Sequence, residues 1–151
     1  INLPLMLENR FWSGIGSREV NLLANDQYER GMKARREVLG DAHVDRCLAA
    51  NDELTKPLQD LVVEYGWGAI WARDGLDRRS RSLINIGMLT ALNRPHELQV
   101  HLKGAINNGC TRVEIVEAVL QTAIYCGMPA ALDTMRHVKA LFDELDGDQG
   151  A

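Results

Sequence analysis

Helix start and stop signals divide most of this chain into short amphipathic segments. These signals restrict the possible folds more than any other feature of the sequence. Gly40, Gly109 and Gly127 each follow a run with apolar residues at helical spacing. Pro57 and Pro95 suit the first turns of helices. No segment shows the sustained apolar–polar alternation, bounded by hairpin turns, that is typical of β-strands. The sequence therefore predicts an all-α fold, a single-domain bundle of several helices.

The same signals predict where each helix begins and ends. Thr111 and Glu114 form a capping box, in which each side chain satisfies a backbone donor of the other. The helix after Asp77 is apolar on nearly every side, so we expect it to be central. Residues 1–24 form an N-terminal arm of unclear role, residues 25–147 the helical domain and residues 148–151 a tail. The expected helices run from Asn25 or Asp26 to about Leu39, from Asp41 to Ala50, from Leu58 to about Trp67, from Asp77 to about Leu92, from Pro95 to just before Gly109, from Thr111 to just before Gly127, and from Pro129 to about Leu145.

Composition and charge exclude several classes of function. The 151 residues fit one domain, with 46% hydrophobic and 25% charged residues. A net charge of −4 argues against nucleic-acid binding and against adhesion to anionic membranes. No apolar run is long enough for a membrane span, and we expect no signal peptide. The widely spaced Cys47, Cys110 and Cys126 argue against a disulfide framework, a zinc site or a dithiol pair, which indicates a reducing, cytoplasmic setting.

His101 is the strongest candidate for a catalytic residue. It lies on the apolar stripe of its predicted helix, between Leu98 and Leu102, and Glu97 lies one turn before it on the same face. A carboxylate there can orient the imidazole and stabilise its charged form, as a general acid or base requires. The alternative is a core histidine satisfied by its neighbour. Metal binding is disfavoured because no third ligand falls at a suitable spacing.

A group of arginines is the second candidate. Arg78 and Arg81 share a face at the start of their predicted helix, where positive charge opposes the helix dipole. This unfavourable placement suggests that they bind a carboxylate. The alternative is an ordinary solvated basic face.

Aromatic residues at helical spacing are the third candidate. Trp67 and Trp71 lie four residues apart, as core residues or as the wall of a pocket for a small unsaturated ring. Tyr125 shares a face with Glu117 and Gln121, a ridge that either borders a site or meets solvent. We treat Cys126 as a small buried hydrophobic residue.

Taken together, these stretches resemble the γ-carboxymuconolactone decarboxylase family over about residues 26–146. The resemblance rests on residues 28–46, 67–73, 78–83, 93–112 and 121–131. The wider superfamily contains alkylhydroperoxidase D-like proteins, which use a CxxC before a histidine. The positions that match those cysteines are Arg94 and Glu97 here, while the histidine is retained as His101. Dithiol peroxidase chemistry is therefore disfavoured.

The resemblance implies an alkylhydroperoxidase D-like helical fold, a ring-shaped hexamer or trimer, and a reaction without cofactor or metal. The implied substrate is 4-carboxymuconolactone, which loses carbon dioxide to give 3-oxoadipate enol-lactone in the protocatechuate branch of the β-ketoadipate pathway. A catalytically silent ligand-binding or scaffold relative is the alternative. The expected roles are carboxylate anchoring by Arg81 with Arg78, proton donation or oxyanion stabilisation by His101 held by Glu97, and shaping of the ring pocket by Trp67, Trp71 and Tyr125.

Overall fold

The computed structural model describes the backbone of residues 17–148 and the side chains of residues 26–147. Every regular element in residues 17–148 is a helix, so the predicted all-α fold is confirmed. The elements are α1 Ser17–Leu39, α2 Asp41–Ala49, α3 Lys56–Leu61, the π-helix η1 Val62–Trp71, α4 Arg78–Ala91, α5 Pro95–Asn107, α6 Arg112–Tyr125 and α7 Met128–Asp148. Among the described residues, no helix is long and apolar enough to cross a membrane.

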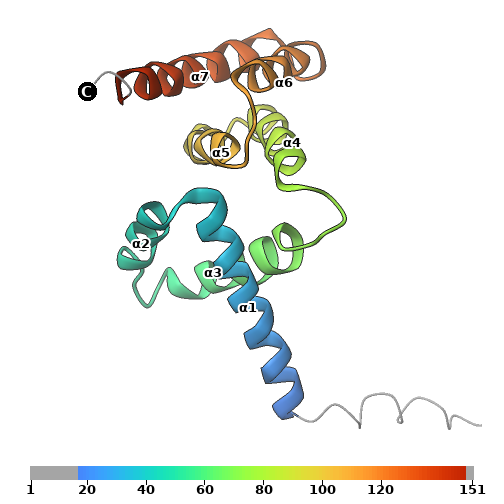
Figure 1. Ribbon diagram of the computed structural model, residues 1–151, viewed down its shortest axis with the longest axis vertical. Coiled ribbons are helices and arrows are strands. Elements are labelled where there is room, and N and C mark those ends of the chain that lie inside the picture. The colour runs from blue at the N-terminus through green and yellow to red at the C-terminus, as the bar shows by residue number, and fades with distance from the viewer. Residues whose placement is uncertain (1–16, 149–151) are drawn as a thin grey trace, which may run out of the picture.

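The helices form two packed groups that meet through α5. In Figure 1, α6 and α7 lie together at one end, α4 and α5 occupy the middle, and α1 crosses η1 at the other end. The larger buried cluster includes Ile86, Leu102, Val119 and Val138, one from each of α4 to α7. A smaller cluster joins α1 to η1, and α1 also packs on α5.

Two glycines let α1 and η1 cross at very short range. A Cβ atom on Gly31 would lie 2.2 Å from the backbone oxygen of Val63, and one on Gly68 would lie 2.2 Å from the backbone oxygen of Gln27. Since no real Cβ approaches an oxygen so closely, both positions require glycine. This crossing fixes the direction from which η1 presents its aromatic residues.

The helix expected at residues 58–67 is longer than predicted and changes its register. It continues as far as Trp71, and from Val62 onward its backbone has π-helical geometry. The spacing of the apolar residues could not predict this change, because it fits an α-helix almost as well as a π-helix. π-Helical turns are rare and often occur at functional sites.

The predicted stop signals and the caps at Asp77 and Thr111 are confirmed, whereas Asp41 is the first residue of α2 and does not cap it. Gly40, Gly109 and Gly127 all have positive φ, at 83°, 82° and 99°. Asp77 accepts a hydrogen bond from the Ser80 N–H at the start of α4, and the capping box at the start of α6 is complete.

The predicted start of the first helix is wrong. α1 begins at Ser17, so Asn25 and Asp26 lie inside the helix and neither caps it. Residues 17–24 contain neither glycine nor proline, and nothing in them stops a helix from extending upstream. Asp26 pairs with Arg30 one turn later instead. The rest of the predicted arm, residues 1–16, lies outside the described residues.

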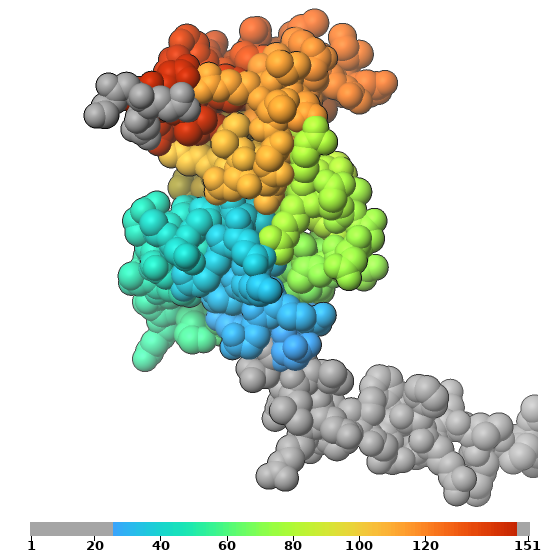
Figure 2. All heavy atoms as spheres, viewed as in Figure 1, coloured from blue at the N-terminus to red at the C-terminus, as the bar shows by residue number. Residues whose placement is uncertain are grey.

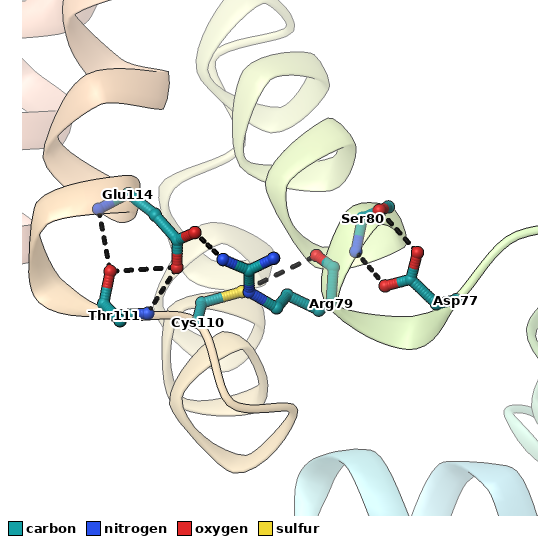
Figure 3. Close-up of polar contacts among 6 residues, drawn as sticks. All are labelled: Asp77, Arg79, Ser80, Cys110, Thr111 and Glu114. Carbon is teal, nitrogen blue, oxygen red and sulfur yellow. Dashed lines mark hydrogen bonds and ion pairs between the residues drawn. The ribbon is translucent and has the colours of Figure 1, made fainter.

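Polar contacts tie the start of α4 to the start of α6 (Figure 3). Arg79 forms an ion pair with Glu114, the capping-box residue of α6. The buried thiol of Cys110 donates to the backbone oxygen of Arg79 at 3.5 Å. Burial raises the pKa of this thiol, so Cys110 stays protonated and serves packing. These contacts fix where α4 begins, and α4 carries two residues of the site described below.

α4 is central in the bundle, as predicted, but one of its faces remains exposed. Ile86 is fully buried, whereas Ile84 and Met88 are each 49% exposed. Figure 2 shows α4 and α6 side by side at the surface, and α6 adds further exposed apolar side chains there. The exposed apolar side chains on α4, on α6 and at the start of α7 are here called the α4–α6 apolar surface. They are Ile84, Met88, Val113, Leu120, Ile124, Tyr125, Met128 and Leu132.

Candidate active site

Three aromatic rings from two helices stack at the junction of η1 and α5. The ring centroids of Trp67 and Trp71 lie 5.1 Å apart, with an angle of 28° between the planes. The imidazole of His101 is stacked on both indoles, with centroids 6.2 Å from Trp67 and 5.9 Å from Trp71. The structure therefore brings together three of the residues that the sequence singled out, as one aromatic stack.

The two tryptophans are core residues, the first of the two interpretations offered for them. Each is buried, and they pack with Ala34 and Val38 of α1 in the smaller core cluster. The same rings hold the imidazole of His101, which is half-buried. A histidine ring held between fixed aromatic surfaces has little rotational freedom, so its nitrogens keep a defined direction.

Asn85 on α4 completes the surroundings of the imidazole. Its amide nitrogen lies 3.4 Å from Nδ1 of His101. An amide N–H can only donate, so this contact makes Nδ1 the acceptor and places the proton of the neutral ring on Nε2. We did not single out Asn85 from the sequence. The available signal was a polar residue one turn after Arg81, within the otherwise apolar stretch 83–89.

The surroundings favour the neutral form of His101. Burial lowers the pKa of its imidazole, and the nearby His43 lowers it further, whereas the Glu97 carboxylate raises it. Burial is the largest of these effects, so the pKa lies below its usual value of 6.5. Glu97 is exposed and makes no hydrogen bond to His101 within the described part of the chain. The carboxylate thus acts at a distance and does not orient the ring.

The two predicted carboxylate anchors have partners within the chain. Arg81 donates to the backbone oxygens of Leu76 and Arg73, both at 3.2 Å, and so braces the loop between η1 and α4. Arg78 forms an ion pair with Glu37 of α1 at 2.6 Å. Arg81 still lies one turn from Asn85 on α4, which keeps it at the edge of the aromatic stack.

Tyr125 is placed elsewhere on the molecule. It is 81% exposed and lines a hollow of about 690 Å³ between α4 and α6. Glu117, Gln121 and Cys126 line the same hollow, whereas His101 and the tryptophans do not. The prediction that Cys126 is buried is wrong, because it follows α6 as an exposed C-cap residue.

The two positions that match the cysteines of the alkylhydroperoxidase D-like proteins are occupied by Arg94 and Glu97. Arg94 is the residue before α5 and Glu97 lies in its exposed first turn, with His101 one turn further on. Within residues 26–147, no group of three or more histidine, cysteine, aspartate or glutamate side chains is arranged to hold a metal ion.

Comparison with known proteins identifies the family of this chain. The carboxymuconolactone decarboxylase family matches residues 56–140. A 4-carboxymuconolactone decarboxylase from Acinetobacter baylyi is 38% identical over 80% of this chain and 92% of its own length. A nitrosuccinic acid decarboxylase from Metarhizium robertsii is 44% identical over 72% of this chain and 76% of its own length. A 4-carboxymuconolactone decarboxylase from Pseudomonas putida is 43% identical over 28% of this chain and 88% of its own length.

The matched region contains the aromatic stack, Asn85 and both candidate arginines. It covers more than half of the chain, and the Acinetobacter relative is matched over nearly its whole length. The chain belongs to the carboxymuconolactone decarboxylase family, and it is an enzyme of the carboxy-lyase class.

Proposed function

We propose that this protein decarboxylates 4-carboxymuconolactone to 3-oxoadipate enol-lactone, a step of the protocatechuate branch of the β-ketoadipate pathway, without a cofactor or metal. The Acinetobacter relative that carries this name matches 80% of the chain. The observation that carries the proposal is the imidazole of His101, stacked on two tryptophans and favoured in its neutral form. The three cysteines are all free, in keeping with a cytoplasmic location.

The substrate supplies its own electron acceptor. The bond between the ring carbon and the leaving carboxylate breaks, and carbon dioxide departs. The electron pair of that bond moves through the ring double bond onto the lactone carbonyl oxygen, giving a furanolate-like dienolate. A proton then adds to the ring carbon next to the carbonyl. The protein needs only to bind the dianion, stabilise the oxyanion and deliver the proton.

His101 suits the second and third of these tasks. With Nδ1 facing Asn85, the Nε2–H group of the neutral ring is available as a donor. It can donate a hydrogen bond to the lactone oxygen as negative charge develops there. The growing oxyanion favours the imidazolium form, so Nδ1 can take a proton from water in place of its hydrogen bond from Asn85, and Nε2–H can then give its own proton to the ring carbon, which leaves a neutral imidazole.

A second substrate is favoured by the relative from Metarhizium robertsii, which is 44% identical over 72% of the chain. Nitrosuccinic acid also has two carboxylates, and its nitro group can accept the electron pair left by carbon dioxide. Both candidate substrates therefore belong to one class: dicarboxylates in which an electron-accepting group is placed to receive the electron pair that the departing carbon dioxide leaves behind. A nitrosuccinate-like substrate is our second candidate.

We further propose that the enzyme is a homo-oligomer, a ring-shaped hexamer or a trimer. The α4–α6 apolar surface supports this, because many exposed large apolar side chains on neighbouring helices of a small protein favour a contact surface.

The proposed function is tested by supplying both substrates to one preparation. Protein dialysed against a chelator should release carbon dioxide from freshly made 4-carboxymuconolactone, with a higher kcat/KM than for 2-nitrosuccinate. His101→Ala, purified in parallel, controls for contaminating activity. A higher kcat/KM for 2-nitrosuccinate would support the second candidate. Turnover of neither compound, or turnover that requires added metal, would contradict the proposal.

A further inference from the structure

Arg35 is a buried arginine, two of whose nitrogen atoms have no hydrogen-bond partner among the described residues. Its side chain is only 5% exposed, and its Nε and Nη1 atoms are buried with no hydrogen-bond partner in the described part of the chain. The next residue, Arg36, faces outward and pairs with Asp41 and Asp45. A buried charge that lacks both a counter-ion and hydrogen bonds is strongly unfavourable, so proteins rarely retain one without a use for it.

Arg35 leaves α1 where this helix meets the aromatic stack. Ala34 and Val38, on either side of it along the helix, pack in one buried cluster with Trp67 and Trp71. Those indoles are the rings on which His101 is stacked. The unpaired guanidinium is therefore built into the helix segment that supports the candidate active site.

Electrostatic effects connect Arg35 to His101 through a third residue. The positive charge of Arg35 is one of the causes that lower the pKa of His43, after burial and the charge of Arg46. His43 in turn lowers the pKa of His101. The charge of Arg35 thus acts on His43, and His43 acts on His101, although Glu97 affects His101 more strongly than His43 does.

His43 also lines a hollow at the surface. It has a volume of about 470 Å³, lies between α2 and α5, and is lined by four basic side chains and one carboxylate. The carboxylate, Asp41, already pairs with Arg36. Such a site attracts anions. The basic residues are His43, Arg46, His96 and Lys103.

A carboxylate is the ligand that fits these features. A guanidinium binds a carboxylate through charge-assisted hydrogen bonds, and the Nε and Nη1 atoms of Arg35, which lie on different edges of the group, can each donate one. The arginines expected to anchor the substrate, Arg78 and Arg81, already have partners in the chain. Arg35 has none among the described residues.

Building on the proposed function, we propose that Arg35 binds one carboxylate of a dicarboxylate substrate beside the Trp67–Trp71–His101 stack. The bound group is the carboxylate that the product keeps. Positive charge held against the leaving carboxylate would oppose its loss, whereas charge on the retained one anchors the substrate through every step. The ligand class is a small dicarboxylate dianion.

The first test is a binding experiment that requires no turnover. Succinate, which has two carboxylates but no electron acceptor, is titrated into the full chain while thermal unfolding is followed, with sodium chloride at matched ionic strength as the reference. The wild type should gain about 5–10 °C at a succinate concentration one hundred times the dissociation constant. The absence of a saturable gain over chloride would overturn the proposal.

Variants at adjacent positions then identify the residue responsible. Arg35→Met should abolish the succinate effect, Arg35→Lys should weaken it, and the matched control Arg36→Met should retain it. In succinate-free buffer, Arg35→Met should unfold no lower than the wild type, because an unpaired buried charge has been removed. A clear drop in its unfolding temperature, or a smaller oligomer, would mean that Arg35 pairs with a carboxylate of the N-terminal residues or of a neighbouring subunit. Either result would overturn the proposal, as would a retained succinate effect in Arg35→Met.

Activity measurements separate this inference from the proposed function. If the enzyme acts on 4-carboxymuconolactone, Arg35→Met should raise KM about 10- to 100-fold, as expected for lost hydrogen bonds to a charged group. Arg36→Met should leave KM unchanged. An unchanged KM in Arg35→Met would overturn the role of Arg35. Succinate binding that depends on Arg35, without turnover of the lactone, would support Arg35 and contradict only the proposed substrate.

Discussion

At the scale of single residues, the neutral imidazole of His101 is the feature from which reactivity follows. Its neighbours are two indole faces and an amide, and none of them stabilises an imidazolium as an adjacent carboxylate would. Burial therefore controls the protonation of this histidine, and Glu97 only reduces the effect. The spacing of Glu97 and His101 in the sequence suggested a hydrogen-bonded histidine–carboxylate pair, and the described residues do not form one.

Replacing His101 by alanine should separate catalysis from structure. We expect His101→Ala to keep its helical content and assembly but to lose about 10²- to 10⁴-fold in turnover, the usual contribution of a general acid–base group. Rates and thermal unfolding should be measured on the same samples. Asn85→Ala, which frees Nδ1 without removing the imidazole, should cause a smaller loss. A folded His101→Ala enzyme with a near-normal rate would remove His101 from the mechanism.

The pH dependence should show an acid limb. Because the pKa of folded His101 is lowered, the unfolded chain binds its proton more readily than the folded chain just below pH 6.5. The free energy of unfolding should thus fall as the pH drops below about 6.5, and the fall should be smaller in His101→Gln. Over the same range kcat/KM should decline, since a proton on Nδ1 replaces the hydrogen bond from the Asn85 amide that orients the ring in the free enzyme. Activity that rises on acidification would show that the imidazolium form is required instead.

At the scale of elements, the crossing of α1 and η1 is the contact that places the tryptophans. Gly31→Ala and Gly68→Ala should each destabilise the protein by about 1–3 kcal/mol or more, because the new methyl group meets backbone atoms that cannot move aside easily. Gly66→Ala is the matched control in the same π-helix, since its Cβ would meet nothing within 4 Å. Urea unfolding gives the energies, and near-ultraviolet circular dichroism reports the tryptophan environment. Equal stability of all three variants would mean that the crossing is looser than described.

The caps, the π-helix η1 and the candidate site show which structural features could be predicted from the sequence. The caps at Asp77 and Thr111 were predictable because the donor and acceptor lie within three residues of each other. The π register of η1 and the approach of Gly31 to Gly68 were not, because both depend on a helix distant in the sequence. In the site, the spacing of four residues between Trp67 and Trp71 predicted that their rings lie on one face of a helix. The backbone partners of Arg81 and the isolation of Arg35 leave no trace in a local pattern.

At the scale of the whole molecule, the α4–α6 apolar surface predicts association. Ile124 is 74% exposed and Leu120 is 50% exposed on this surface. The double variant Leu120→Asp and Ile124→Asp should have a smaller oligomer mass in light scattering than the wild type, while its helical content is retained. Leu54→Asp, at a residue that is 86% exposed before α3, is the control and should leave the mass unchanged. A wild-type mass equal to that of one chain would contradict the proposed oligomer.

The stacking of His101 on two indoles has an optical consequence. An imidazolium ring quenches indole fluorescence more strongly than a neutral imidazole, and here both rings lie in contact with one titrating group. In a Trp12→Phe background, the remaining emission comes from Trp67 and Trp71 alone. That emission should decrease as His101 gains a proton and should change again when a dianion binds nearby and favours the charged ring. The enzyme thus contains an intrinsic fluorescent indicator, with which the protonation state of its candidate catalytic group can be followed in real time during a single turnover.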